Sequence, residues 1–129
     1  MPDKLVRKLS DQLGQIAMGR DPLYQQPSFR QTMGAFYGML QDDATAKRLR
    51  ESRIETLLLE FTMFAQAQLR KRLPTEADVQ AELDVETDLF VRVVHDVLRT
   101  IPGVSRDLTD YVSRYMARDV ERPLSLIHI

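Results

Sequence analysis

The sequence predicts a compact all-α domain of about five to six helices. Apolar residues recur at three- and four-residue spacing along most of the chain, which is the period of helices buried on one face. The segments with this period are separated by short stretches that contain Gly or Pro, residues that end helices. No segment shows the alternation of apolar and polar residues that predicts a half-buried strand.

The composition is that of a single globular domain. Of the 129 residues 43% are hydrophobic, enough to build one core. The 18 Lys and Arg nearly balance the 19 Asp and Glu, so no overall charge draws the chain to nucleic acid or to an anionic membrane. We therefore expect no nucleic-acid or membrane partner. The absence of Cys and of an apolar leader segment predicts a cytoplasmic location.

Two helices are expected in the first third of the chain. The first runs from about Asp3 to Met18 and is ended by Gly19. A polar connector follows, so residues 1–27 form an N-terminal helix and its connector. Ser28 is expected to cap the second helix, which reaches about Gln41. The apolar faces of these two helices carry Leu5, Val6, Leu9, Leu13, Ile16, Ala17, Phe29, Met33, Phe36, Tyr37 and Leu40.

The middle of the chain is expected to be helical from Asp42–Asp43 to the residue before Pro74, as one helix or as two joined near Ser52. Thr75 is the expected N-cap of a short helix through Val79 and Leu83. A further helix from Thr87 is too apolar for the surface and is predicted to lie at the centre of the fold. Pro102–Gly103 ends it, and a final helix covers about Ser105 to Glu121.

The last six residues, 124–129, read Leu-Ser-Leu-Ile-His-Ile. This is the in-frame translation of the transposon mosaic end used in sequencing libraries. We expect the tail to be a translated sequencing adaptor in a metagenomic sequence, so the domain is taken to span residues 28–123. The alternative is a natural apolar tail. His128 is therefore left out of any site.

The residues that bear chemistry form no catalytic or metal-binding pattern. Asp84 to Asp88 resemble the start of a calcium loop, but Leu89 and His95 stand where that loop needs Gly and a carboxylate. We expect a solvated acidic turn there. His95 has no ligand partner at helical spacing, and no set of acid, base and nucleophile indicates an enzyme. Gly34 and Gly38 are expected to allow close helix packing, and the basic cluster of Lys47, Arg48, Arg50 and Arg53 is a candidate partner surface.

Four segments occur in the order of a known family. They are Phe36–Asp43, which contains Phe-Tyr and a following Leu-x-Asp-Asp, then Glu60–Ala65, then Val79–Val85 with Phe90, and then 104–120. Together they resemble the truncated haemoglobins, the short bacterial globins. The resemblance implies a globin-like fold with a pocket between its helices. The implied lining residues are Phe36, Tyr37, Phe61, Phe64, Gln80 and Phe90.

The chain departs from that family at the haem ligand. Gln80 stands at the position of the proximal histidine, and a neutral amide is a poor ligand for haem iron. We therefore expect no cofactor, with haem held only through an unusual ligand if at all. The resemblance then implies a haem-free sensory or protein-interaction module, whose partner is another protein or a second copy of the chain.

Two alternatives stay open. One is a haem- or oxygen-binding truncated haemoglobin with unusual ligation. The other is a helix-turn-helix regulator that binds nucleic acid, because Leu73–Val79 resembles a helix start in bacterial sigma factors. Against the second alternative, Glu76, Asp78 and Glu82 on that helix would repel phosphate.

Overall fold

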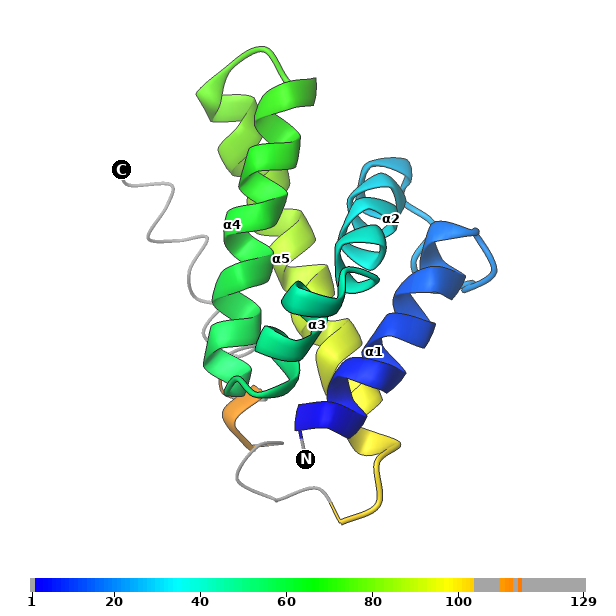
Figure 1. The fold of residues 1–129 in the computed structure, drawn as a ribbon. Coiled ribbons are helices and arrows are strands. Elements are labelled where there is room, and N and C mark those ends of the chain that lie inside the picture. Colours follow the sequence, from blue (N-terminus) through cyan, green and yellow to red (C-terminus); the bar gives the residue numbers. More distant parts are fainter. Residues whose placement is uncertain (1, 104–109, 113, 115–129) are drawn as a thin grey trace.

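The computed structural model describes residues 2–103, 110–112 and 114, and these residues contain helices and no strand. The predicted all-α class is therefore confirmed. Five helices have defined bounds: α1 (Pro2–Ala17), α2 (Pro27–Leu40), α3 (Asp43–Arg50), α4 (Ile54–Arg72) and α5 (Glu76–Arg99) (Figure 1). Most of the predicted final helix, Ser105–Glu121, lies outside the described residues.

Helix α1 ends as predicted at Gly19. The backbone N–H of Gly19 donates to the carbonyl of Ile16 at 3.0 Å, and that of Arg20 donates to the carbonyl of Gln15 at 2.9 Å. This pair of bonds is a Schellman motif, which needs a left-handed residue, and Gly19 has φ +73°. The turn directs the connector back toward α2.

Alanine at Gly19, just after α1, and at Gly38, inside α2, is expected to have opposite effects. A Cβ at Gly19 would strain the left-handed backbone and would lie 2.6 Å from the Arg30 guanidinium, so Gly19→Ala should lower the free energy of unfolding by about 1 to 2 kcal/mol. Gly38 lies inside α2 with open space around its Cα. Gly38→Ala should therefore raise the free energy of unfolding by about 0.5 to 1 kcal/mol. Urea unfolding measures both, and a Gly19→Ala variant as stable as the parent would contradict the prediction.

The surroundings of Gly34 and Gly38 test the prediction that these glycines allow close helix packing. A Cβ at Gly34 would lie 3.6 Å from that of Ala17, so α1 does approach α2 there. The prediction is wrong for Gly38, which has no atom of a neighbouring element within 4 Å of a Cβ built on it. Helical periodicity identifies the face of a residue but not the height at which a neighbouring helix crosses it.

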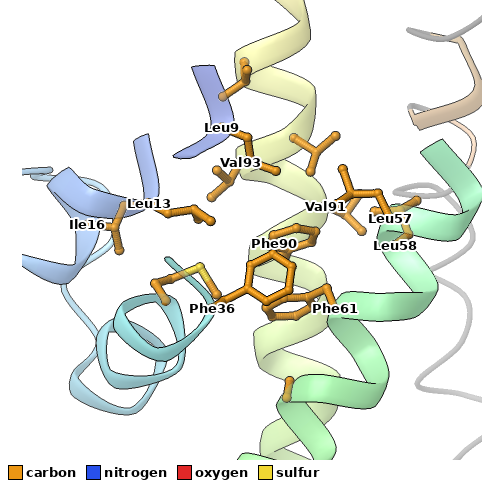
Figure 2. Packing of buried hydrophobic residues seen from close by; sticks show 14 of the residues in the cluster. Leu9, Leu13, Ile16, Phe36, Leu57, Leu58, Phe61, Phe90, Val91 and Val93 are labelled. Atoms are coloured by element: carbon orange, nitrogen blue, oxygen red, sulfur yellow. The ribbon is translucent and has the colours of Figure 1, made fainter. Parts of the chain in front are cut away.

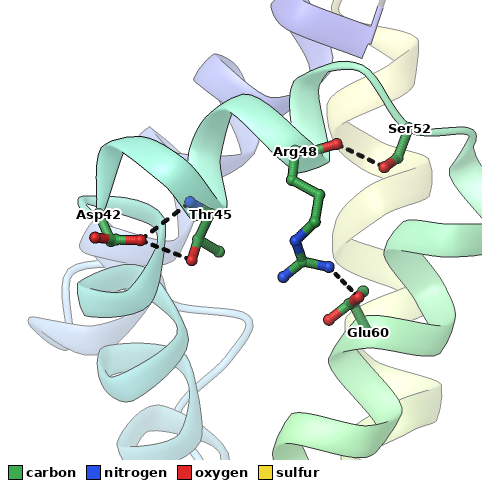
Figure 3. A network of polar contacts seen from close by, with 5 residues as sticks. All are labelled: Asp42, Thr45, Arg48, Ser52 and Glu60. Carbon is green, nitrogen blue, oxygen red and sulfur yellow. Dashed lines mark hydrogen bonds and ion pairs between the residues drawn. The ribbon is translucent and has the colours of Figure 1, made fainter.

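Of the two expected helix caps, Thr75 is present and Ser28 is not, and Asp42 caps α3 in addition. The Asp42 carboxylate accepts from the Thr45 N–H at 3.0 Å and from the Thr45 hydroxyl at 2.8 Å (Figure 3). The Thr75 hydroxyl oxygen accepts from the Asp78 N–H at 3.1 Å. The prediction for Ser28 is wrong. Helix α2 begins at Pro27 with Gln26 as N-cap, since proline favours the first helical turn, and this leaves the Ser28 hydroxyl for another partner.

The stretch from Asp43 to Arg72 forms two helices, α3 and α4, which is one of the two arrangements predicted for it. The break after α3 is held by the Ser52 hydroxyl, which donates to the Arg48 carbonyl at 2.6 Å, and by an ion pair between Arg48 and Glu60 of α4 (Figure 3). Both contacts lie at the surface. They fix the corner at which α4 turns to run beside α5.

A second prediction is wrong. Helix α5 is a single helix where a short helix, an acidic turn and a central helix were expected. Asp84 to Asp88 lie within its 24 residues. Since every turn of an α-helix exposes some positions and buries others, one acidic residue of this segment, Glu86, points inward and is fully buried.

The central position predicted for the apolar part of α5 is confirmed. Val91 faces Leu57 and Leu58 of α4, while Val93 faces Leu9 of α1 (Figure 2). Burial on both sides explains why this segment lacks the polar stripe of a surface helix. Helix α1 contributes to the same hydrophobic cluster through Leu9, Leu13 and Ile16, all fully buried, so the N-terminal helix shares the core of the residues that follow it.

Candidate functional site

The aromatic residues of the implied haem pocket meet at the centre of the fold. Phe36 of α2, Phe61 of α4 and Phe90 of α5 are fully buried (Figure 2). The Phe61 and Phe90 rings stack with centroids 3.8 Å apart, and both are perpendicular to the Phe36 ring with centroids 5.5 and 5.6 Å from it. Edge-to-face and stacked pairs at these distances are direct ring contacts. The three rings therefore pack against one another.

The other three implied lining residues lie around or away from this cluster. Phe64 is partly buried, with its ring 5.4 Å from that of Phe36. The Tyr37 ring lies against Gly14 of α1, where an added Cβ would be 3.4 Å from it. Gln80 is exposed, and its amide donates to Asp84 at 3.1 Å. This donor set does not fit haem held as in the truncated haemoglobins, because the residue at the ligand position faces solvent with a neutral amide.

A polar network that was not predicted lies beside the aromatic cluster. The fully buried Glu86 carboxylate accepts from the Ser28 hydroxyl at 2.6 Å and from the Thr32 hydroxyl at 2.5 Å. Arg72, at the end of α4, donates to the Thr32 hydroxyl oxygen at 2.7 Å and to the Gln31 side chain at 2.9 Å. The network therefore joins α2, α4 and α5 through charged and hydroxyl groups.

Burial raises the pKa of Glu86 above its ordinary value of 4.5, because the charged carboxylate loses its hydration. The hydroxyls of Ser28 and Thr32 act in the opposite direction, Glu82 one turn away adds to the rise, and the Arg72 guanidinium lowers the pKa. Desolvation is the largest of these effects. The network thus holds a carboxyl that binds its proton more tightly when the chain is folded.

A cleft of about 410 Å³ opens between α1, the connector to α2 and the C-terminal half of α5. Known small-ligand pockets span about 300 to 1,000 Å³, so this volume suits a side chain or a small molecule. Leu23 supplies exposed apolar surface, while Val93 and Val97 also line the cleft but are 0% and 5% exposed. The other lining residues are polar or charged: Lys8, Asp11, Gln12, Gln15, Asp21, Tyr24, Asp96 and Thr100.

Asp21 is held rigidly at the wall of this cleft. Its side chain is 7% exposed, and it accepts from the Leu23 N–H at 2.9 Å and from the Gln12 amide. The Gln25 amide donates to the Asp21 carbonyl. A short polar loop therefore keeps a carboxylate in place without a salt bridge to it in the described residues.

Tyr24 joins the connector to α5. Its hydroxyl donates to Asp96 at 3.2 Å, and its ring packs at 5.8 Å from Phe29. Burial raises the pKa of the Tyr24 hydroxyl well above its usual range, and the negative charge of Asp96 raises it further. Tyr24 is therefore a constant hydrogen-bond donor, while the Asp96 side chain stays 54% exposed at the rim.

Lys8 of α1 also lines the cleft. Its ammonium donates to the Thr100 carbonyl at the end of α5, at 3.2 Å. Arg92 is near enough to lower the pKa of Tyr24, but its guanidinium pairs with Asp88 at 3.5 Å and it does not line the cleft. The lining residues thus include three carboxylates, from Asp11, Asp21 and Asp96, and one ammonium, from Lys8.

None of the cleft residues belongs to a sequence pattern that predicts a site. They come from residues 8–24 and 93–100, and helical spacing alone does not show that the polar face of α1 meets the end of α5. The basic cluster that was a candidate partner surface is partly neutralised, because Arg48 pairs with Glu60 and Arg50 with Asp3 at 3.5 Å. Among the described residues, no group of three or more His, Cys, Asp or Glu is arranged to hold a metal ion.

The described helices include none with the length and apolarity needed to cross a membrane. No family model matches the chain, and no solved structure matches it. Over 78 residues the chain is 36% identical to an uncharacterised protein, C11E3.02c, of Schizosaccharomyces pombe. The match covers 60% of this chain but 6% of that protein, so the chain spans a small part of this relative. The resemblance to the truncated haemoglobins stays a prediction.

Proposed function

We propose that this domain is a haem-free, helical protein-interaction module whose partner enters the cleft between α1, the connector and α5. The observation that carries the proposal is the cleft itself, which combines the exposed apolar side chain of Leu23 with fixed polar groups at its wall. Binding sites generally pair apolar surface with a few oriented polar groups. The direct packing of the Phe36, Phe61 and Phe90 rings supports a role without haem.

Peptide titration of the ¹⁵N-labelled protein tests the proposal. Three 12-residue peptides, one basic, one acidic and one neutral, would be added in turn while amide shifts are followed by NMR. We expect at least one peptide to produce saturable shifts in residues 8–24 and 93–100. Gln15 is an exposed lining residue, so Gln15→Trp should block the cleft and abolish these shifts.

The matched control places the same large side chain elsewhere. Glu55 is exposed at the start of α4 and does not line the cleft, so Glu55→Trp should leave the shifts unchanged. The proposal fails if no peptide shifts the cleft amides, or if the shifts centre on the exposed Leu59 and Met63 of α4 instead. A sharp haem band on adding haemin to the folded protein would favour the haem-binding alternative.

A further inference from the structure

Helix α4 carries apolar side chains on the face that points away from the core. Leu59 and Met63 lie one turn apart and are 59% and 60% exposed, and the exposed Ala67 continues the stripe by another turn. The opposite side of the helix supplies Phe61 and Ala65, both fully buried, to the core. Scattered exposed apolar residues need no explanation, whereas adjacent ones form a surface that association can bury.

The two ends of this face carry opposite charges. Glu55 is exposed in the first turn of α4, and Arg70 is exposed in the last turn. A second α4 helix running antiparallel would place the acid of each helix beside the base of the other, whereas a parallel one would bring like charges together. The face is therefore complementary in charge to a reversed copy of itself, as a twofold interface requires.

The spacing of the residues along α4 fits such a pairing. Leu59, Met63, Gln66 and Arg70 follow the four-three-four spacing of a seam between two helices. With Met63 near a twofold axis, Leu59 of one helix lies beside Gln66 of the other. Glu55 and Arg70 stand at nearly equal distances on either side of Met63, about 12 and 10 Å along the helix axis. They therefore come level with each other across the axis.

We infer that two copies of the domain associate weakly and reversibly through this face, with antiparallel α4 helices, Met63 against Met63, and Glu55 of each copy paired with Arg70 of the other. Arg70 pairs with Glu76 at 2.9 Å within one copy, and the five N–H donors of a guanidinium leave donors for a second carboxylate. The inference is independent of the proposed function. None of these residues lines the cleft, so the dimer presents two open clefts.

Single cysteines test the geometry, because the chain has none of its own. Met63→Cys, near the axis, should give a disulfide-linked dimer under mild oxidation. Leu59→Cys should not, since the two copies of residue 59 lie about 12 Å apart along the helix axes and a disulfide needs Cα atoms within about 7 Å. Met18→Cys is the matched control, because Met18 is 65% exposed and lies outside this face. Cross-linking of Leu59→Cys, or of Met18→Cys as fast as Met63→Cys, overturns the inference.

Sedimentation equilibrium over a range of protein concentrations measures the association itself. Glu55→Arg and Arg70→Glu each bring like charges together and should weaken the dimer about three- to tenfold, while the variant with both changes should regain most of the loss. Met63→Lys should weaken the dimer at least about tenfold, because it buries an unpaired charge at the axis. Met18→Lys should leave the association unchanged. Circular dichroism of each variant establishes that a lost dimer does not reflect unfolding.

The outcomes are separate from those of the peptide titration, which follows the cleft amides. A parent protein that stays monomeric up to roughly 1 mM overturns the inference, and the α4 face is then left to another protein or to another segment of the chain. A dimer that Met63→Lys does not weaken forms through a different surface and also overturns it. So does a double charge reversal that is as weak as either single change.

Discussion

Phe90→Ala is expected to lower the free energy of unfolding by about 3 to 5 kcal/mol. Phe90 is fully buried at the centre of α5 and contacts both Phe36 and Phe61. Its removal would take away a stacked and an edge-to-face contact and leave a cavity where three helices meet. Urea unfolding followed by circular dichroism measures the change.

Phe64→Ala is the matched control for this prediction. Phe64 is partly exposed and has one ring contact with the cluster, to Phe36, so its loss should cost about 1 to 2 kcal/mol. Equal losses for Phe64→Ala and Phe90→Ala would show that the rings are not packed as described. A small loss for Phe90→Ala would mean that the cluster surrounds an open pocket.

Glu86→Ala is expected to lower the free energy of unfolding by about 2 to 3 kcal/mol, although it replaces a charged residue by a good helix former. The substitution removes the acceptor of the Ser28 hydroxyl and of the Thr32 hydroxyl. It also removes the negative charge that interacts with the Arg72 guanidinium, which donates to the Thr32 hydroxyl oxygen. Buried donors without partners account for the loss.

Glu82→Ala is the control for this change. Glu82 lies one turn earlier on α5 and is partly exposed, and its charge raises the pKa of Glu86. Its removal relieves repulsion and leaves the network bonds in place, so the variant should be at least as stable as the parent. If Glu82→Ala and Glu86→Ala are equally destabilising, helix charge and not the buried network explains the effect.

The raised pKa of Glu86 gives this network a pH dependence of known sign. Below the ordinary value of 4.5 the carboxyl is protonated in both the folded and the unfolded chain. As the pH rises from there through the folded-state pKa, the unfolded chain releases the proton first, so the free energy of unfolding falls. Glu86→Gln should remove this fall. Urea unfolding between pH 4 and 8 measures it, and parallel curves for the parent and the variant would contradict the prediction.

The sequence by itself determined the fold class, most of the helix ends and the residues of the core. Gly19, Asp42 and Thr75 mark ends that depend on local chemistry, namely a left-handed turn and two side-chain caps. The apolar spacing that places Phe36, Phe61 and Phe90 on buried faces is also a local property. Such features can be read from neighbouring residues alone.

Only the tertiary structure determined which residues the buried helix faces contact. The segment around Glu86 has the composition of a solvated turn, and its burial depends on Ser28 and Thr32, which are more than 50 residues away. The cleft likewise forms because α1 packs against α5, so that Lys8 of α1, Asp21 of the connector and Asp96 of α5 line one cleft. Contacts between residues distant in sequence leave no periodic pattern, so helical spacing predicted which residues are buried and could not predict which polar groups they bring together.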